Sequence, residues 1–187
     1  MENLTQLIKG LELENQITLE ELPQIDLYMD QVIQLFENKY NSSKRNDEEK
    51  VLTKTMINNY AKGKLFFPIK NKKYSKEHLI LISLIYQLKG ALSINDIKET
   101  LSGVNEKIIK EDFEIDRLYN SFLHLAEKNL VNFHEDIERK SKNVIEEVEQ
   151  LDDKDSNQLE KVLMIAALAN MSNLYRRLAE KLVDELN

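Results

Sequence analysis

Apolar and polar positions alternate along the chain with the three- and four-residue spacing of amphipathic helices. Thr53, Ser75 and Ser93 stand before three such segments, where a side-chain oxygen can cap the first turn. Thr18 and Glu21 have the spacing of a capping box ahead of a further helix. The pattern predicts an all-α fold with helices over about residues 2–14, 25–40, 53–63, 76–89, 94–102, 112–151 and 157–186.

One segment, residues 65–74, interrupts this helical pattern. Pro68 stops a helix from continuing and restricts Phe67 before it to extended backbone. Asn71 and Lys72 can form the turn of a small hairpin. The sequence therefore predicts a minimal β-hairpin here, and it is the only β structure we expect.

Polar segments indicate how the chain is divided. Residues 41–49 are charged and without periodicity, which predicts a loop. The segment from Gly103 to Glu111 is the best candidate boundary, which gives one module over residues 1–103 and a second over 104–187. The polar segment 152–157, which contains three aspartates, separates the last two predicted helices, so we expect these to fold back as a long antiparallel hairpin.

The composition supports long helices and limits the possible chemistry. Only 4 Gly and 2 Pro occur in 187 residues, so turn-forming residues are few. The absence of cysteine excludes disulfides, thiolate metal sites and cysteine nucleophiles. The first residues lack the basic and apolar regions of a signal peptide, and apolar runs of about ten residues are too short to span a bilayer. We therefore expect a cytoplasmic protein without a membrane segment.

Positive charge is concentrated in one stretch of an otherwise acidic chain. The net charge is −7, yet the segment from Lys50 to Lys76 contains eight lysines and no Asp or Glu. This stretch carries +8 and the remainder of the chain −15. A basic island of this kind is typical of a confined anion-binding face, and a solvated lysine-rich surface is the alternative.

The predicted elements around this stretch have the order of a winged helix-turn-helix: helix, loop, short helix, hairpin and helix. Met56, Ile57 and Tyr60 give the short helix 53–63 an apolar face that can anchor it as a recognition helix. Asparagine pairs with adenine at two points, and lysine reaches guanine or phosphate. The candidate DNA-binding residues are Lys54, Thr55, Asn58, Asn59 and Lys62 on this helix, Lys64 directly after it, and Lys70, Lys72, Lys73 and Tyr74 on the wing over residues 65–74.

The same stretch resembles two related families. The segment LTKTMINNYAKGKLFFPIKNKKYSKEHL is similar to the DNA-binding part of the MerR family. The residues at the positions of that family's motif are Ile57, Tyr60, Gly63, Leu65, Pro68, Tyr74 and Ser75. Residues 17–103, beginning with ITLEELPQIDLYMDQVIQLFE, look like domain-of-unknown-function family 1836, a bacterial family regarded as MerR-like. The resemblance implies a MerR-like winged helix-turn-helix module and a DNA-binding transcriptional regulator.

Two departures from the MerR pattern keep a second hypothesis open. Asn58 or Lys54 replaces the usual arginine at the start of the recognition helix, and the loop before it is long and carries Asp47, Glu48 and Glu49. The alternative is a protein-interaction module with a degenerate helix-turn-helix and no specific DNA binding.

No pattern in the sequence indicates an enzyme, a cofactor or a metal site. Asp153, Asp155 and Asn157 match the first three ligand positions of an EF-hand loop. However, Gln158 replaces the required glycine and Met164 the required glutamate. The three histidines fit no metal motif, and motifs for phosphate binding or nucleophilic catalysis are missing. We expect a protein that is not an enzyme.

The last predicted helix suggests self-association. It is apolar on almost all sides between Val162 and Met171, whereas a helix buried on one side needs only a narrow apolar stripe. Small residues that allow close helix approach are Ala166, Ala167, Ala169 and Ser172. These features predict a homodimer formed through the C-terminal helices.

Overall fold

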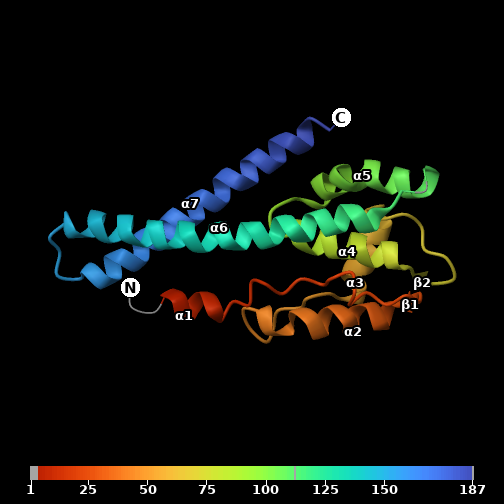
Figure 1. Cartoon of the computed structure of the whole chain (residues 1–187), viewed down its shortest axis with the longest axis horizontal. Coiled ribbons are helices and arrows are strands. Elements are labelled where there is room, and N and C mark those ends of the chain that lie inside the picture. The colour runs from red at the N-terminus through yellow and green to blue at the C-terminus, as the bar shows by residue number, and fades with distance from the viewer. Residues whose placement is uncertain (1–3, 112, 187) are drawn as a thin grey trace. The chain divides into compact units, whose positions relative to one another are not determined.

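The fold is known from a computed structural model, which describes residues 4–111 and 113–186 (Figure 1). These residues are mostly helical and include one small two-stranded antiparallel sheet, which confirms the predicted helical class. The elements in chain order are α1 (Leu4–Lys9), β1 (Leu27–Tyr28), α2 (Met29–Tyr40), the short 3-10 helix η1 (Asn41–Ser43), α3 (Lys54–Lys62), β2 (Lys73–Tyr74), α4 (Lys76–Leu88), α5 (Ile94–Lys110), α6 (Ile115–Glu149) and α7 (Ser156–Asp184).

The chain divides into two compact units. The first, which we call the module unit, comprises residues 15–124 with 180–187. The second, the hairpin unit, comprises residues 1–14 with 125–179. All ten residues with predicted DNA contacts and the small sheet therefore belong to the module unit, and most of α6 and α7 belong to the hairpin unit.

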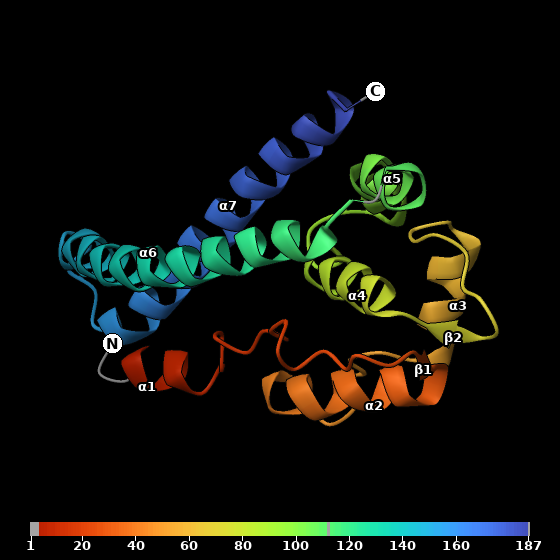
Figure 2. The same cartoon turned by 45° about the vertical axis from the view of Figure 1, so that its right-hand side comes forward.

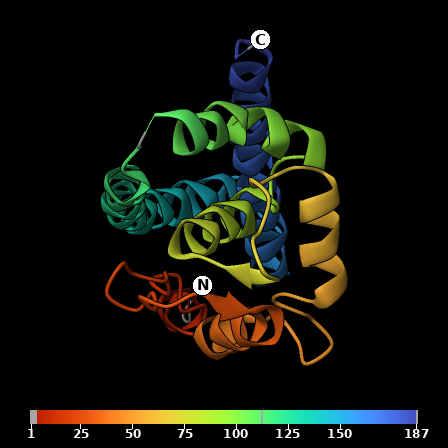
Figure 3. The same cartoon turned by 90° about the vertical axis from the view of Figure 1, so that its right-hand side faces the viewer.

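The core of the module unit is centred on α4. Leu79, Ile82 and Ile85 are fully buried, and so are the intervening Ile80 and Leu81. A helix that is apolar on all sides must be covered by several neighbours. Figures 2 and 3 show α4 lying between α2, α3 and α5. The helix predicted over residues 76–89 is confirmed as α4.

Three helix starts follow the predicted capping pattern. The Thr53 hydroxyl oxygen accepts a hydrogen bond from the Met56 amide at 3.1 Å, which caps α3. Ser93 and Asp96 cap α5 reciprocally, each side chain accepting from the backbone amide of the other at 3.2 and 3.1 Å. Ser75 precedes α4, with the His78 side chain accepting from its amide. These local contacts satisfy amides that no helical turn can satisfy.

The start of α2 differs from the prediction. The Thr18 amide does donate to the Glu21 carboxylate at 2.8 Å, but this contact closes an isolated turn rather than opening a helix. The helix begins only at Met29, since Leu27 and Tyr28 form β1. The predicted start near residue 25 was therefore wrong, because pairing with a distant strand holds this segment extended.

Two other helix ends were also misplaced. The first helix ends at Lys9 instead of residue 14, with a turn at Gly10. The helix expected to end near Gly103 continues to Lys110. A Cβ atom at Gly103 would meet nothing within 4 Å, so this glycine lies on an open face. Relative to alanine, a glycine inside a helix lowers the stability by only about 1 kcal/mol. Burial of the neighbouring Leu101 side chain stabilises the same helix by more than this, about 1.5–3 kcal/mol.

The sheet joins both ends of the segment that contains α2 and α3. Leu27 pairs with Tyr74 and Tyr28 with Lys73 in antiparallel register. The predicted turn at Asn71 and Lys72 is present: their φ angles are 52° and 59°, and the Lys73 amide donates to the Lys70 carbonyl at 2.9 Å. The expectation that the hairpin is the only β structure was wrong, because β2 pairs with β1.

In the hairpin unit, α7 turns back after residues 152–155 and crosses α6 (Figure 1). The buried contact between them is formed by Ile137, Val144 and Val148 of α6 and Met164 of α7. The helix α1 adds Leu4 and Ile8 to this cluster. Across the described ranges 4–111 and 113–186, no helix is long and apolar enough to cross a membrane.

Candidate nucleic-acid interface

The helix α3 has one buried and one exposed face. Ile57 and Tyr60 are only 0% and 4% exposed and fix the helix to the core of the module unit. On the opposite side, five polar or basic side chains at helical spacing are all exposed, namely Lys54, Thr55, Asn58, Asn59 and Lys62. The structure thus brings together on one surface the five residues that the sequence predicted for this helix.

The chain leaves α3 through a tight connection. Gly63 follows the helix with an ordinary φ of −72°, and Lys64 takes the left-handed conformation at φ 57°. A Cβ atom at Gly63 would lie 2.8 Å from Leu65 Cδ1 and 3.1 Å from the Asn59 carbonyl oxygen. Glycine is required here for close approach, and not for the positive φ usual at a helix C-terminus.

The wing over residues 65–74 combines buried and exposed positions. Its first residues, Leu65 and Phe66, are buried. Of its lysines, Lys70 and Lys72 are exposed and Lys73 is half-buried, and Lys64 directly before the wing is exposed. The Lys73 ammonium lies 5.2 Å from the centroid of the Tyr28 ring, a cation–π contact between the two strands.

The prediction that Tyr74 contacts DNA is corrected by its burial. Tyr74 is only 1% exposed, and its ring packs edge-on against Phe66 and His78. Burial also raises the pKa of its hydroxyl above the ordinary range. Its inward orientation follows from the strand register, because Tyr74 pairs with the buried Leu27.

Two side chains hold the backbone of the wing to the helices beneath it. The Asn105 amide nitrogen on α5 donates to the Leu65 carbonyl at 3.0 Å, and to the Leu101 carbonyl at 2.9 Å. His78 Nε2 on α4 lies 3.1 Å from the Phe67 carbonyl oxygen. The sequence analysis missed both residues. A signal existed for Asn105, which follows Ile97 and Leu101 at four-residue spacing on the apolar face of its helix.

The positive charge of this surface is only lightly neutralised. Lys54 pairs with Asp30 at 2.8 Å, but both side chains are largely exposed and such pairs contribute about 0–1 kcal/mol. Within the described part of the chain, no carboxylate pairs with the exposed lysines of the α3–wing surface, which are Lys62, Lys64, Lys70 and Lys72. These ammonium groups are available to an anionic partner.

The long connection between α2 and α3 is folded back onto α2. The Glu37 carboxylate accepts from the Lys44 ammonium at 2.6 Å and from the Val51 amide at 3.3 Å. The Lys44 hydrogen bond holds the pKa of Glu37 below its usual range. Val51 and Leu52 are buried. The connection is therefore anchored at both ends, and its length does not separate the two helices, which pack against each other.

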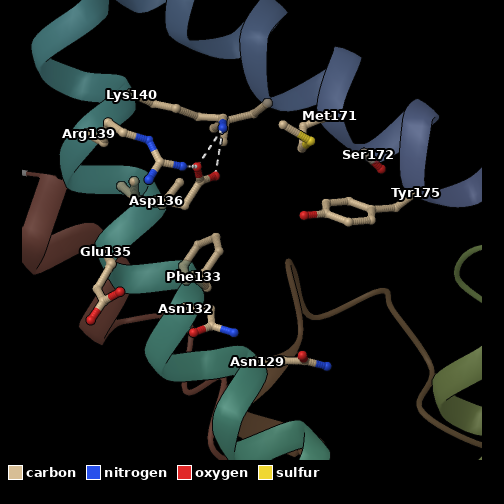
Figure 4. A pocket seen from close by; sticks show the side chains of 12 residues that line it. Asn129, Asn132, Phe133, Glu135, Asp136, Arg139, Lys140, Met171, Ser172 and Tyr175 are labelled. Carbon is tan, nitrogen blue, oxygen red and sulfur yellow. Dashed lines mark hydrogen bonds and ion pairs between the residues drawn. The ribbon is translucent and has the colours of Figure 1, made fainter.

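The hairpin unit contains a groove of its own, about 700 Å³ in volume, between α6 and α7 (Figure 4). Phe133 of α6 and Met171 and Tyr175 of α7 line it. At one end the Asp136 carboxylate accepts from Lys140 and Arg139, each at 2.6 Å. The Lys140 hydrogen bond is the main reason that the pKa of Asp136 is lowered.

The acidic turn between α6 and α7 does not assemble a metal site. Asp153 accepts from the Asp155 amide at 2.8 Å, and both side chains are exposed. Among the residues with described positions, no three carboxylate or imidazole side chains gather in a way that could hold a metal ion.

The fold and this surface define a mostly helical protein with a small sheet and a lysine-lined face. A family model described as domain of unknown function (DUF1836) matches residues 17–122, more than half of the chain. The chain belongs to this family, as its sequence predicted. No curated protein and no solved structure is detectably similar to it.

Proposed function

We propose that the protein is a DNA-binding transcriptional regulator of the winged helix-turn-helix kind, acting in the cytoplasm as a homodimer. The observation that carries this proposal is the division of α3 into two faces. One face is anchored by Ile57 and Tyr60, and the other presents Asn58, Asn59 and Lys62 to the solvent beside the lysines of the wing.

The dimensions of α3 suit the major groove of DNA. An α-helix with its side chains is about 10–12 Å across, so it fits into a groove about 12 Å wide, and the nine residues of α3 give it two and a half turns with one exposed face. In this arrangement Asn58 and Asn59 read base edges, with Lys54 and Lys62 beside them. The wing lysines neutralise phosphates, which fixes the orientation of α3 without reading sequence.

The acidic net charge of −7 favours a confined contact. A protein of this charge is repelled by DNA over most of its surface, so attraction is restricted to the acid-free stretch between Lys50 and Lys76. This repulsion would orient the protein during its approach to DNA.

The dimer part of the proposal rests on the exposed face of α7. Six large apolar residues of α7 are more than half exposed, namely Val162, Ile165, Leu174, Tyr175, Leu178 and Leu182. A surface this apolar is typical of an interface. We propose that a second copy covers it, since Ala166, Ala169 and Ser172 on the same helix permit close approach of an identical helix.

A protein-interaction module remains the second candidate. One observation that favours it is the pairing of Lys54 with Asp30. The other is the connection between α2 and α3, residues 41–53, which is much longer than the three or four residues usual in a helix-turn-helix. A protein partner of this surface would be acidic, because the lysines would need carboxylates in place of phosphates.

Selection from a pool of random duplex DNA distinguishes the two candidates. We expect the purified protein to enrich one sequence motif, and the Asn58→Ala/Asn59→Ala variant to bind DNA without enriching it. The control variant is Lys142→Ala, an exposed change on α6 outside the groove, which should retain the motif. A wild-type protein that retains no DNA above background would contradict the proposal and favour the protein-interaction candidate.

A further inference from the structure

The two-stranded sheet has a buried face and an exposed face. Leu27 pairs with Tyr74, and both side chains are buried. Tyr28 pairs with Lys73 in the same register. Residues directly opposite each other in an antiparallel pair point to the same face, and neighbours along a strand point to opposite faces. Tyr28 and Lys73 therefore share the face of the sheet that is turned away from the core.

Tyr28 is a large aromatic residue on this outer face, and it is 55% exposed. The Lys73 ammonium lies 5.2 Å from the centroid of its ring. A cation–π contact at an exposed site is weak, so it orients the two side chains more than it stabilises the fold. The backbone at Tyr28 is fixed as well, because its amide donates to the Gln31 side-chain oxygen at 2.8 Å. An exposed aromatic ring is thus held in one place without serving the core.

The Tyr28–Lys73 pair adjoins both parts of the α3–wing surface. Lys73 directly follows the turn of the wing at residues 71 and 72. Asp30, two residues after Tyr28, forms an ion pair with Lys54 at the start of α3, with 2.8 Å between the charged atoms. Figures 2 and 3 show the sheet close to α3. The pair therefore connects the exposed face of α3 with the lysines of the wing.

The donors on this face suit a phosphate group. A tyrosine hydroxyl can donate one hydrogen bond, and a lysine ammonium carries a full positive charge. A phosphate of the DNA backbone has two unesterified oxygen atoms, so it can accept from both groups together. Asp30 is the nearest carboxylate along the chain, and Lys54 offsets its charge. Across the described residues, Lys73 forms no ion pair with a carboxylate of its own.

We propose that Tyr28 is a further DNA-contacting residue, whose hydroxyl donates to a backbone phosphate that Lys73 neutralises. This inference rests on the proposed DNA-binding function and adds a residue to that same surface. A phosphate contact carries no sequence information, so Tyr28 is a positioning residue. It fixes how α3 and the wing lie on the duplex while Asn58 and Asn59 read the bases.

Chemical modification of tyrosine in the presence of DNA tests the proposal with an internal control. Of the seven tyrosines, Tyr28 and Tyr175 are exposed, and the other five are buried or half-buried. In the free protein, tetranitromethane should therefore nitrate these two first. A saturating amount of random-sequence duplex DNA should slow the nitration of Tyr28 several-fold. The rate at Tyr175, which lies on α7, should be the same with and without DNA, as measured by mass spectrometry of peptides.

Two matched variants test the hydroxyl group itself. Tyr28→Phe keeps an aromatic ring beside Lys73 and removes only the hydroxyl. We expect this variant to bind duplex DNA about tenfold more weakly, which is the contribution of one hydrogen bond to a charged group. Its salt slope should equal that of the wild type, because no charge is removed. Tyr175→Phe is the same change at the other exposed tyrosine and should bind as the wild type does.

The outcomes separate this inference from the proposed function. DNA that binds without protecting Tyr28, or that protects Tyr28 and Tyr175 equally, would overturn the role of Tyr28 and leave the DNA-binding function standing. A Tyr28→Phe variant that binds as tightly as the wild type would do the same. A wild-type protein that binds no duplex DNA even at low salt would instead contradict the proposed function, and the role of Tyr28 with it.

Discussion

At the scale of single residues, α3 depends on a few buried side chains that anchor an otherwise polar helix. Ile57 and Tyr60 lie within one continuous core with Leu79, Ile82 and Ile85 of α4. A nine-residue helix is too short to be stable alone in water, so its position must come from this packing. The exposed polar residues of α3 are then not needed for packing and are available for contacts with a partner.

Replacing Tyr60 by alanine should therefore cost about 3–5 kcal/mol in the free energy of unfolding, as large-to-small changes in a core do. Its neighbour Asn59 is exposed, and Asn59→Ala should change the free energy by less than about 0.5 kcal/mol. Urea denaturation of both variants measures the difference. Equal stabilities would mean that Tyr60 does not anchor α3.

At the scale of elements, the features that sequence could predict are those with local causes. The caps at Thr53 and Ser93 depend on residues three positions away, and the turn at Asn71 and Lys72 on its own backbone preferences. β1 could not be predicted in this way, because its partner strand is distant in the chain and its two residues carry no strand pattern.

The errors in the predicted DNA-binding site have the same cause, namely contacts between residues that are distant in the chain. Tyr74 is polar at its tip and stands among exposed lysines, but strand pairing turns it into the core. His78 and Asn105 contact the backbone of the wing, and a sequence does not reveal where distant carbonyls will lie. The exposed face of α3 was predictable because helical spacing alone separates it from Ile57 and Tyr60.

Replacing Gly63 or Gly103 by alanine should change the free energy of unfolding in opposite directions. Gly63→Ala places a methyl group against Leu65 and the Asn59 carbonyl and should cost about 1–3 kcal/mol by overpacking. Gly103→Ala meets open space within α5 and should stabilise the protein by about 0.5–1 kcal/mol. Thermal unfolding of both variants is the measurement, and a stabilising Gly63→Ala would show that the tight connection after α3 is not required.

At the scale of the whole molecule, the proposed homodimer can be tested by its mass. Light scattering should give about twice the chain mass of 21.9 kDa. Ile165→Glu should convert the dimer to monomer without unfolding it, because Ile165 is exposed on α7 in the single chain and the new charge would be buried only in the interface. The same reasoning applies to Ala169→Glu.

The control for this experiment is Lys142→Glu, an exposed change of the same final residue on α6. It should leave the mass of the dimer unchanged. A wild-type chain that remains a monomer at high micromolar concentration contradicts the dimer, and an Ile165→Glu protein that stays dimeric would place the interface elsewhere.

The central claim is that the surface of α3 and the wing binds DNA, and the salt dependence of duplex binding tests it most directly. Each neutralised phosphate contributes about −0.9 to the slope of log affinity against log salt concentration. Contacts by Lys64, Lys70, Lys72 and Lys73 predict a slope of about −4 for each chain, and Lys70→Ala/Lys72→Ala should reduce its magnitude by about 2. The Lys142→Ala control should retain the wild-type slope. An affinity that does not change with salt, or a Lys70→Ala/Lys72→Ala slope equal to that of the wild type, would contradict the claim.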